Sequence, residues 1–247
     1  MEQKGIAEYT ERLREKEKIG LDVDETLVQL LPDFLHYYNS KYGTKHRLED
    51  FNSYRWWKVL DTTNKQSYKE MENYAKQFRT KEDKLDFYQV KSVPGAIQGL
   101  AELEENYKAY LITNRIDVMS KNTSKIPEAF SRHSKNLGAG KLGNILSEDR
   151  IYYTAGELSK TEVCKKEGID KVIEDNAEEA LELAKEDIKV FLLDRYWTQD
   201  YEEHENIVKV EGEGKLPYPG DDWEKVVKLL SDKTTGFTED PKAKILF

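Results

Sequence analysis

The chain has 247 residues, enough for one large domain or for a core that carries a smaller inserted unit. A net charge of -9 and a pI near 5.2 argue against a protein that binds the backbone of a long nucleic acid, because such binders present basic surfaces. No apolar stretch approaches the roughly 20 residues of a membrane span, and the single cysteine, Cys164, excludes an internal disulfide, so we expect a cytoplasmic protein.

The first third of the chain contains a charged helical pattern, a short strand and a long aromatic segment. Apolar residues recur at helical spacing in residues 6–18 and predict a leading helix. The apolar run Ile19–Leu21 predicts a strand. Residues 30–88 are rich in tyrosine, phenylalanine and tryptophan at helical spacing, which indicates an inserted helical unit.

The rest of the chain alternates between apolar strands and amphipathic helices. Strands are predicted at 107–112, 151–153, 171–173 and 189–193, and helices at 96–105, 160–167, 177–185 and 222–230. This alternation predicts an α/β fold: a Rossmann-like parallel sheet with helices on both faces and a small helical cap inserted after the first strand. We place the core at residues 1–29 and 90–247 and the cap at 30–89.

Two acids directly follow the first predicted strand. Asp22 and Asp24 are two residues apart, so on an extended chain their side chains point the same way, while Val23 between them turns inward. One carboxylate can then attack a substrate while the other moves a proton. The pattern is short, and two acids at a strand end also serve as caps for the following helix.

Further polar residues follow the other predicted strands. Thr113 ends one strand, Glu174 and Asp175 end another, and Lys160 begins a helix. Open parallel sheets collect ligand-binding groups at the carboxyl ends of their strands. A carboxylate nucleophile, an acid/base, a hydroxyl, an ammonium and an acidic pair for a hard cation are the parts that phosphoryl transfer needs.

Four short strings match, in order, the motifs of a known superfamily. They are DVDET (22–26), LITNR (111–115), LSKTEV (158–163) and VIEDN (172–176). From about residue 19 to residue 193 the chain resembles a haloacid dehalogenase superfamily phosphohydrolase. The cap, the third motif and VFLLDRYW (190–197) resemble the cytosolic 5′(3′)-deoxyribonucleotidase type and its bacterial relatives. One departure is Glu25, where many superfamily members carry glycine.

The resemblance implies catalysis through an aspartyl phosphate. Asp22 would attack phosphorus, and Asp24 would protonate the leaving oxygen and later deprotonate the attacking water. Mg²⁺ would be held by the Asp22 carboxylate, the Asp24 backbone carbonyl and the Asp175 carboxylate. Glu174 is an alternative ligand, but adjacent residues at a strand end point in different directions, so we expect only one of the two to face the metal and rank Asp175 first.

The resemblance also implies a phosphate-binding set. Thr113, with its neighbour Asn114, and Lys160 would bind the phosphoryl oxygens. Taken singly, Thr113 could simply cap the end of a strand, and Lys160 could be one more surface ammonium in a lysine-rich chain. Their position within the motifs favours the functional role.

The cap is expected to choose the substrate. Tyr54, Trp56 and Trp57 form an aromatic cluster that could stack on a base, with Arg55 or Arg115 near a phosphate or sugar. The alternative is that these rings build the core of the cap itself. Because two adjacent tryptophans on a helix cannot both face inward, we expect one of Trp56 and Trp57 to reach the cleft or the interface between cap and core.

Several function classes stay open at this point. The first is a magnesium-dependent phosphatase of a small phosphorylated metabolite, most simply a (deoxy)nucleoside 5′-monophosphate, with a sugar phosphate or phosphoglycolate as the alternative. A protein phosphatase also starts with a DLDETLV-like motif, but a bulky cap disfavours it. A non-catalytic binding protein would be expected to lack the nucleophile, and both acids are present. The sequence does not set the oligomeric state.

Overall fold

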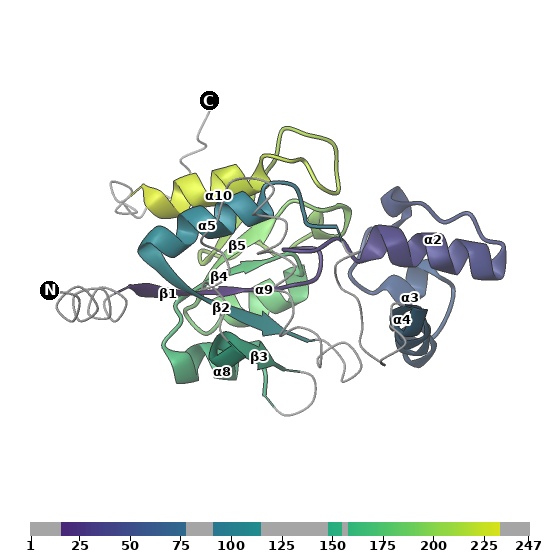
Figure 1. The fold of residues 1–247 in the computed structure, drawn as a ribbon, viewed down its shortest axis with the longest axis horizontal. Coiled ribbons are helices and arrows are strands. Elements are labelled where there is room, and N and C mark those ends of the chain that lie inside the picture. Colours follow the sequence, from purple (N-terminus) through teal and green to yellow (C-terminus); the bar gives the residue numbers. More distant parts are fainter. Residues whose placement is uncertain (1–15, 78–90, 115–147, 155–157, 233–247) are drawn as a thin grey trace, which may run out of the picture.

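A parallel sheet forms the centre of the molecule. The computed structural model describes residues 16–77, 91–114, 148–154 and 158–232 (Figure 1). Within these residues six strands make one sheet in the order β3-β2-β1-β4-β5-β6, and all neighbours are parallel. The strands are β1 (Glu17–Leu21), β2 (Tyr107–Thr113), β3 (Ile151–Tyr153), β4 (Lys171–Glu174), β5 (Lys189–Leu193) and β6 (Ile207–Val210). This confirms the predicted α/β class.

Helices cover both faces of the sheet because its strands are apolar on both sides. In β2, Ala109 and Leu111 pack in the cluster of α5 (Ala96–Asn106) and α10 (Asp222–Ser231). Their neighbours Tyr110 and Ile112 pack in the opposite cluster, with α8 (Lys160–Glu167) and α9 (Ala177–Ala184). Figure 1 shows α5 and α10 side by side on one side of the sheet. Alternating side chains of buried strands therefore fix the two helical layers.

Two expectations about strands and helices need correction. Residues 201–214 carried no predicted strand, yet β6 lies there at the edge of the sheet. Only its outer residues, Ile207 and Val210, are buried, so a four-residue edge strand leaves a weak apolar signal. The leading helix predicted over 6–18 lies largely outside the described residues, and Glu17 and Lys18 belong to β1 instead.

The described part of the cap has an aromatic core of its own. It contains α2 (Leu31–Tyr42), the 3₁₀ turn η1 (Leu48–Asp50), α3 (Trp56–Val59) and α4 (Asn64–Gln77). The Phe34 ring lies 6.0 Å from Tyr38, 6.1 Å from Trp56 and 5.7 Å from Tyr74. Figure 1 shows α2, α3 and α4 grouped beyond one end of the sheet. The boundaries at 29 and 90 stay predictions, and residues 78–90 lie outside the described part.

Two chain segments join the core to the cap and pair with each other. Gln29 N donates to Lys91 O at 2.8 Å, and Val93 N donates to Leu27 O at 2.9 Å. Paired connections restrict how the cap stands over the strand ends. No helix in the described ranges has the length and apolar character needed to cross a membrane.

Glu25 anchors the first cap helix to the core. Its backbone is left-handed, with φ of 59°, a conformation that glycine adopts more readily than other residues. The fully buried carboxyl accepts hydrogen bonds from Leu30 N at 2.8 Å and Leu31 N at 2.6 Å, and from the Tyr218 hydroxyl. Burial raises the pKa of Glu25 to about 7, although these hydrogen bonds act to lower it. The side chain therefore binds amides at the start of α2 that would otherwise lack an acceptor.

We expect Glu25→Ala to lower the free energy of unfolding by about 1–2 kcal/mol, because it removes this acceptor. Glu25→Gly removes the same carboxyl but relieves the left-handed backbone, so it should be about 1 kcal/mol less harmful than alanine. Urea unfolding of the two variants beside wild type measures both effects. Equal stability of the alanine and glycine variants would show that the left-handed backbone at residue 25 is not strained by a side chain.

Candidate active site

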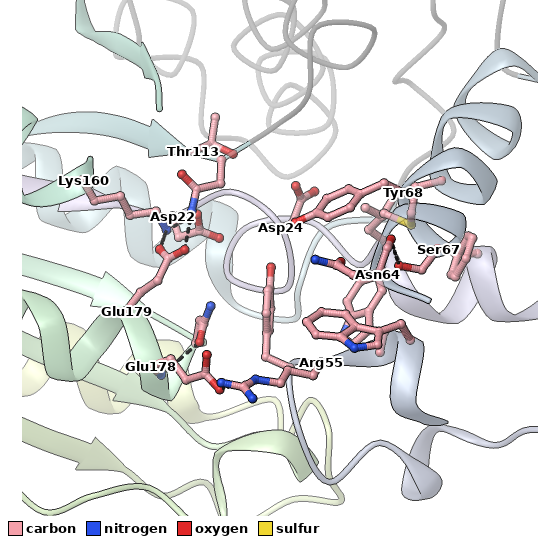
Figure 2. A pocket seen from close by; sticks show the side chains of 18 residues that line it. Asp22, Asp24, Arg55, Asn64, Ser67, Tyr68, Thr113, Lys160, Glu178 and Glu179 are labelled. Carbon is pink, nitrogen blue, oxygen red and sulfur yellow. Dashed lines mark hydrogen bonds and ion pairs between the residues drawn. The ribbon is translucent and has the colours of Figure 1, made fainter. Parts of the chain in front are cut away.

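The predicted site residues meet at the carboxyl ends of the central strands. Strand β1 lies between β2 and β4, which is the point where the strand order reverses. Asp22 follows β1, Thr113 ends β2, Glu174 ends β4, and Lys160 is the first residue of α8. Figure 2 shows Asp22, Thr113 and Lys160 together on the core side of a cavity. The fold thus brings residues far apart in sequence to one edge.

The two acids of the first motif lie as their spacing predicts. Asp22 N donates to Ile173 O at 3.0 Å and so extends the sheet by one bond. Val23 is completely buried in the core, whereas Asp22 and Asp24 both line the cavity. Asp22 is 5% exposed and Asp24 is more accessible. The geometry offers one enclosed carboxylate and one nearer to solvent.

Lys160 is surrounded by three carboxylates. Its Nζ lies 2.7 Å from Asp22 Oδ1, 2.7 Å from Glu174 Oε2 and 2.7 Å from Glu179 Oε2. Burial acts to lower the pKa of Lys160, but the charges of these carboxylates outweigh it and hold the pKa well above its ordinary value. The ammonium is therefore a fixed positive charge beside Asp22 and not a surface lysine.

Sequence reasoning missed Glu179. It lies in the first turn of α9, where acidic residues are usually explained by the helix dipole. Because α9 starts directly after Glu174 and Asp175, its first turn has to lie at the same sheet edge, and that position was the available signal. Glu179 also accepts a hydrogen bond from Asn114 Nδ2, which links it to the end of β2.

Three buried carboxylates form a candidate cation site. Asp22, Glu174 and Asp175 each offer an oxygen, and these oxygens lie within 4.8 Å of one another. Burial raises the pKa of Asp22 to about 6 and that of Glu174 to about 8. The positive charge of Lys160 acts to lower both pKa values but does not outweigh burial. Burial and the charges of Asp22 and Glu174 raise the pKa of Asp175 well above its ordinary value. Oxygen ligands with excess negative charge fit Mg²⁺.

The expectation that only one of Glu174 and Asp175 faces this site is wrong. Strand β4 ends at Glu174 and the backbone bends at Asp175, so the alternation of side chains stops there. Glu174 Oε1 accepts from Asp175 N at 3.2 Å and Asn176 N at 3.1 Å, while its Oε2 contacts Lys160. Glu174 thus shapes the turn as well as contributing charge.

The phosphate-binding candidates differ in their surroundings. Thr113 is 1% exposed and lines the cavity beside Lys160. Asn114 lines it too, but its amide donates to Glu179 and accepts from the Thr154 hydroxyl. Arg115 lies outside the described residues. Thr113 and Lys160 therefore lie together at the cavity, while the exposed Asn114 side chain is bonded to Glu179 and Thr154.

The cap closes the other side of a cavity of about 260 Å³. Its cap wall is mostly apolar and aromatic, with three polar or charged side chains, Arg55, Asn64 and Ser67; the other residues of this wall are Leu30, Phe34, Tyr54, Trp56, Trp57, Tyr68 and Met71. Both tryptophans line the cavity, whereas the sequence predicted that one of them would reach the cleft or the interface between cap and core. Trp56 packs in the cap core at the same time, 6.4 Å from Phe51 between ring centres. A ring can present one edge to the cleft and another to the core.

An ion pair links the two walls. Arg55 Nε of the cap lies 2.8 Å from Glu178 Oε1 of α9, and Figure 2 shows the pair at the rim of the cavity. Their side chains are 44% and 59% exposed, so solvent weakens the attraction. The pair contributes little to stability, and it is one point of contact between cap and core.

Comparison with known proteins gives distant likenesses of fold. No protein-family model matches the chain, and no curated protein matches it. A haloacid dehalogenase-like hydrolase from Streptococcus pneumoniae has 16% identity and a TM-score of 0.46, covering 72% of this chain and 84% of its own. One from Xanthomonas campestris has 14% identity and a TM-score of 0.42, covering 87% and 96%. A predicted phosphoglycolate phosphatase from Haemophilus somnus has 16% identity and a TM-score of 0.44, covering 72% and 85%. Likenesses at this level carry no weight in assigning a reaction.

Proposed function

We propose that the protein is a magnesium-dependent phosphomonoesterase that works through an aspartyl phosphate. The observation that carries the proposal is the position of Asp22, which lies 2.7 Å from a buried ammonium, within a three-carboxylate cluster, and at a cavity shared with Asp24. A nucleophile, an acid/base and fixed positive charge in one enclosed place are what displacement at phosphorus requires.

The chain's own residues supply the proton and bond changes. A carboxylate oxygen of Asp22 attacks phosphorus, and the bond from phosphorus to the ester oxygen breaks while Asp24 gives that oxygen a proton. Water then attacks phosphorus, Asp24 takes the proton from that water, and the bond between phosphorus and Asp22 breaks. Lys160 and Thr113 face the negative charge of the phosphoryl oxygens throughout.

Mg²⁺ is the cofactor that fits. The Asp22 and Asp175 carboxylates would hold it together with the Asp24 backbone carbonyl, and Glu174 lies in the same cluster. When bound, it would neutralise charge on the phosphoryl oxygens. Within the described cluster, the single ammonium of Lys160 faces the three carboxylates of Asp22, Glu174 and Glu179. The excess of negative charge favours binding of a divalent cation.

For the substrate we propose a nucleoside 5′-monophosphate. The aromatic wall of the cavity suits a planar base, and a two-carbon phosphate such as phosphoglycolate would leave most of that wall uncovered. A sugar phosphate or phosphoglycolate would use the same catalytic residues and is the alternative. The cap over the strand ends disfavours a phosphoprotein substrate.

Trp56 offers a direct test of the base-binding wall. Its side chain is largely buried in the cap core, and it also lines the cavity. We expect Trp56→Phe to raise KM for nucleoside monophosphates by about three- to tenfold through loss of aromatic surface at the cavity wall, with kcat and the KM for phosphoglycolate little changed. Steady-state kinetics on both substrates measure this. An equal rise in KM for both would show that Trp56 only packs the cap.

The proposed function is tested by phosphate release from a substrate panel, with Mg²⁺ or with a chelator. The panel contains ribo- and deoxyribonucleoside monophosphates, glucose 6-phosphate, phosphoglycolate and a phosphopeptide. We expect magnesium-dependent release that favours nucleotides. Preference for a sugar phosphate or phosphoglycolate would keep the chemistry and replace the substrate, and absence of release from every compound would overturn the proposal.

A further inference from the structure

Trp197 makes two hydrogen bonds to one residue of the cation cluster. It lies in the 3₁₀ turn η6 (Tyr196–Thr198) that follows β5, and its side chain is 4% exposed. The indole Nε1 is 3.0 Å from the Asp175 backbone oxygen and 2.9 Å from Asp175 Oδ2. One N–H thereby contacts both the main chain and the carboxylate of a fully buried aspartate.

The other carboxylate oxygen of Asp175 is held more loosely. Thr26 Oγ1 donates to Asp175 Oδ1 at 3.3 Å. Asp22 and Glu174 each contact the Lys160 ammonium, whereas no lysine or arginine pairs with Asp175 within the described ranges. Both partners of Asp175 are neutral donors, so they orient the carboxylate without cancelling its charge. That combination suits a cation ligand.

The turn that carries Trp197 also holds the loop after β1. Arg195 is fully buried, pairs with Asp222 at 2.6 Å, and donates to the Glu25 backbone oxygen from Nε at 3.1 Å and from Nη2 at 2.9 Å. Thr198 Oγ1 accepts from Arg195 N at 2.9 Å and closes the turn. Residues 195–198 therefore fix the loops after β1 and β4 relative to each other.

We propose that Trp197 is the positioning residue for Asp175, and that it fixes the carboxylate so that Oδ1 is the oxygen offered to the cation. The inference rests on the proposed function only in needing a divalent cation at this site. Oδ1 is chosen because its single bond, to Thr26, is the longer of the two side-chain bonds. The cation gains a ligand whose orientation is set before binding.

The test is the affinity of the full chain for Mg²⁺ in the absence of substrate, by isothermal titration calorimetry. Trp197→Phe removes the N–H and keeps an aromatic ring, and we expect Mg²⁺ affinity to fall about 10–100-fold. Thr26→Val should weaken it less, because its bond is longer. Tyr107→Phe is the matched control: it deletes another buried side-chain bond to a backbone oxygen, 2.9 Å from the hydroxyl to Leu230 O, at the start of β2 and so at the opposite end of the sheet, and it should leave Mg²⁺ affinity within about twofold of wild type.

Trp197 also packs among the cap aromatics, so a smaller ring could disturb the fold. Benzothienylalanine at position 197 replaces the N–H by sulfur at nearly the same size, and it should reproduce the loss of affinity. Unchanged Mg²⁺ affinity in this variant would overturn the inference while wild-type turnover leaves the proposed function standing. If wild type binds no Mg²⁺ and turns over no substrate, the proposed function fails, and the inference fails with it.

Discussion

Asp22→Asn should lower kcat by at least about 10⁴-fold, because the amide cannot form the aspartyl phosphate. The substitution keeps the size of the side chain and leaves Lys160 with two of its three carboxylates, Glu174 and Glu179. Steady-state phosphate release with the best substrate of the panel measures the loss. A folded variant with the wild-type rate would remove Asp22 as the nucleophile.

The same substitution should not destabilise the protein. Asp22 is 5% exposed, and burial raises its pKa to about 6. Near neutral pH its buried negative charge therefore lowers the free energy of unfolding. A neutral asparagine removes that charge, and we expect a melting temperature equal to or above that of wild type. Thermal unfolding followed by circular dichroism separates this outcome from loss of activity by misfolding.

Lys160→Met should damage both stability and catalysis. It leaves Asp22, Glu174 and Glu179 without their common ammonium in a buried site, so the free energy of unfolding should fall by about 3–5 kcal/mol. Loss of a fixed charge that faces the phosphoryl oxygens should lower kcat/KM by roughly 10²–10³-fold. Urea unfolding and steady-state kinetics measure the two effects.

A matched control lies one turn further along the same helix. Lys165 pairs with Glu186, but their side chains are 56% and 49% exposed, so Lys165→Met should change the free energy of unfolding by less than about 1 kcal/mol. Adding Glu179→Gln to Lys160→Met should recover part of the lost stability by removing one uncompensated carboxylate. Equal stability of the Lys160 and Lys165 variants would contradict the buried charge cluster.

The sequence predicted those parts of the fold and site that depend on local pattern. Apolar runs located five strands, and the rule that ligand groups gather at the carboxyl ends of parallel strands placed Asp22, Thr113 and Lys160 at one edge. The two-residue period predicted that Val23 would be buried between Asp22 and Asp24. Each of these inferences needs only the backbone geometry of a few residues.

The parts that were missed depend on packing between distant segments. The bond from Trp197 to Asp175 joins two different loops, and no periodicity in either loop predicts it. The sequence did not tell which cap aromatics would line the cavity, and both Trp56 and Trp57 do. Strand β6 is short and half-exposed at the sheet edge, so its pattern resembles that of a loop.

The most direct test of the account is to trap the covalent intermediate. The wild-type chain is mixed with Mg²⁺ and its best substrate, quenched in acid during turnover, digested, and analysed by mass spectrometry. We predict that the peptide containing Asp22 carries the added mass of one phosphoryl group, and that Asp22→Asn shows none. Rapid turnover with no phosphorylated peptide, or with the phosphoryl group on another residue, would contradict the mechanism.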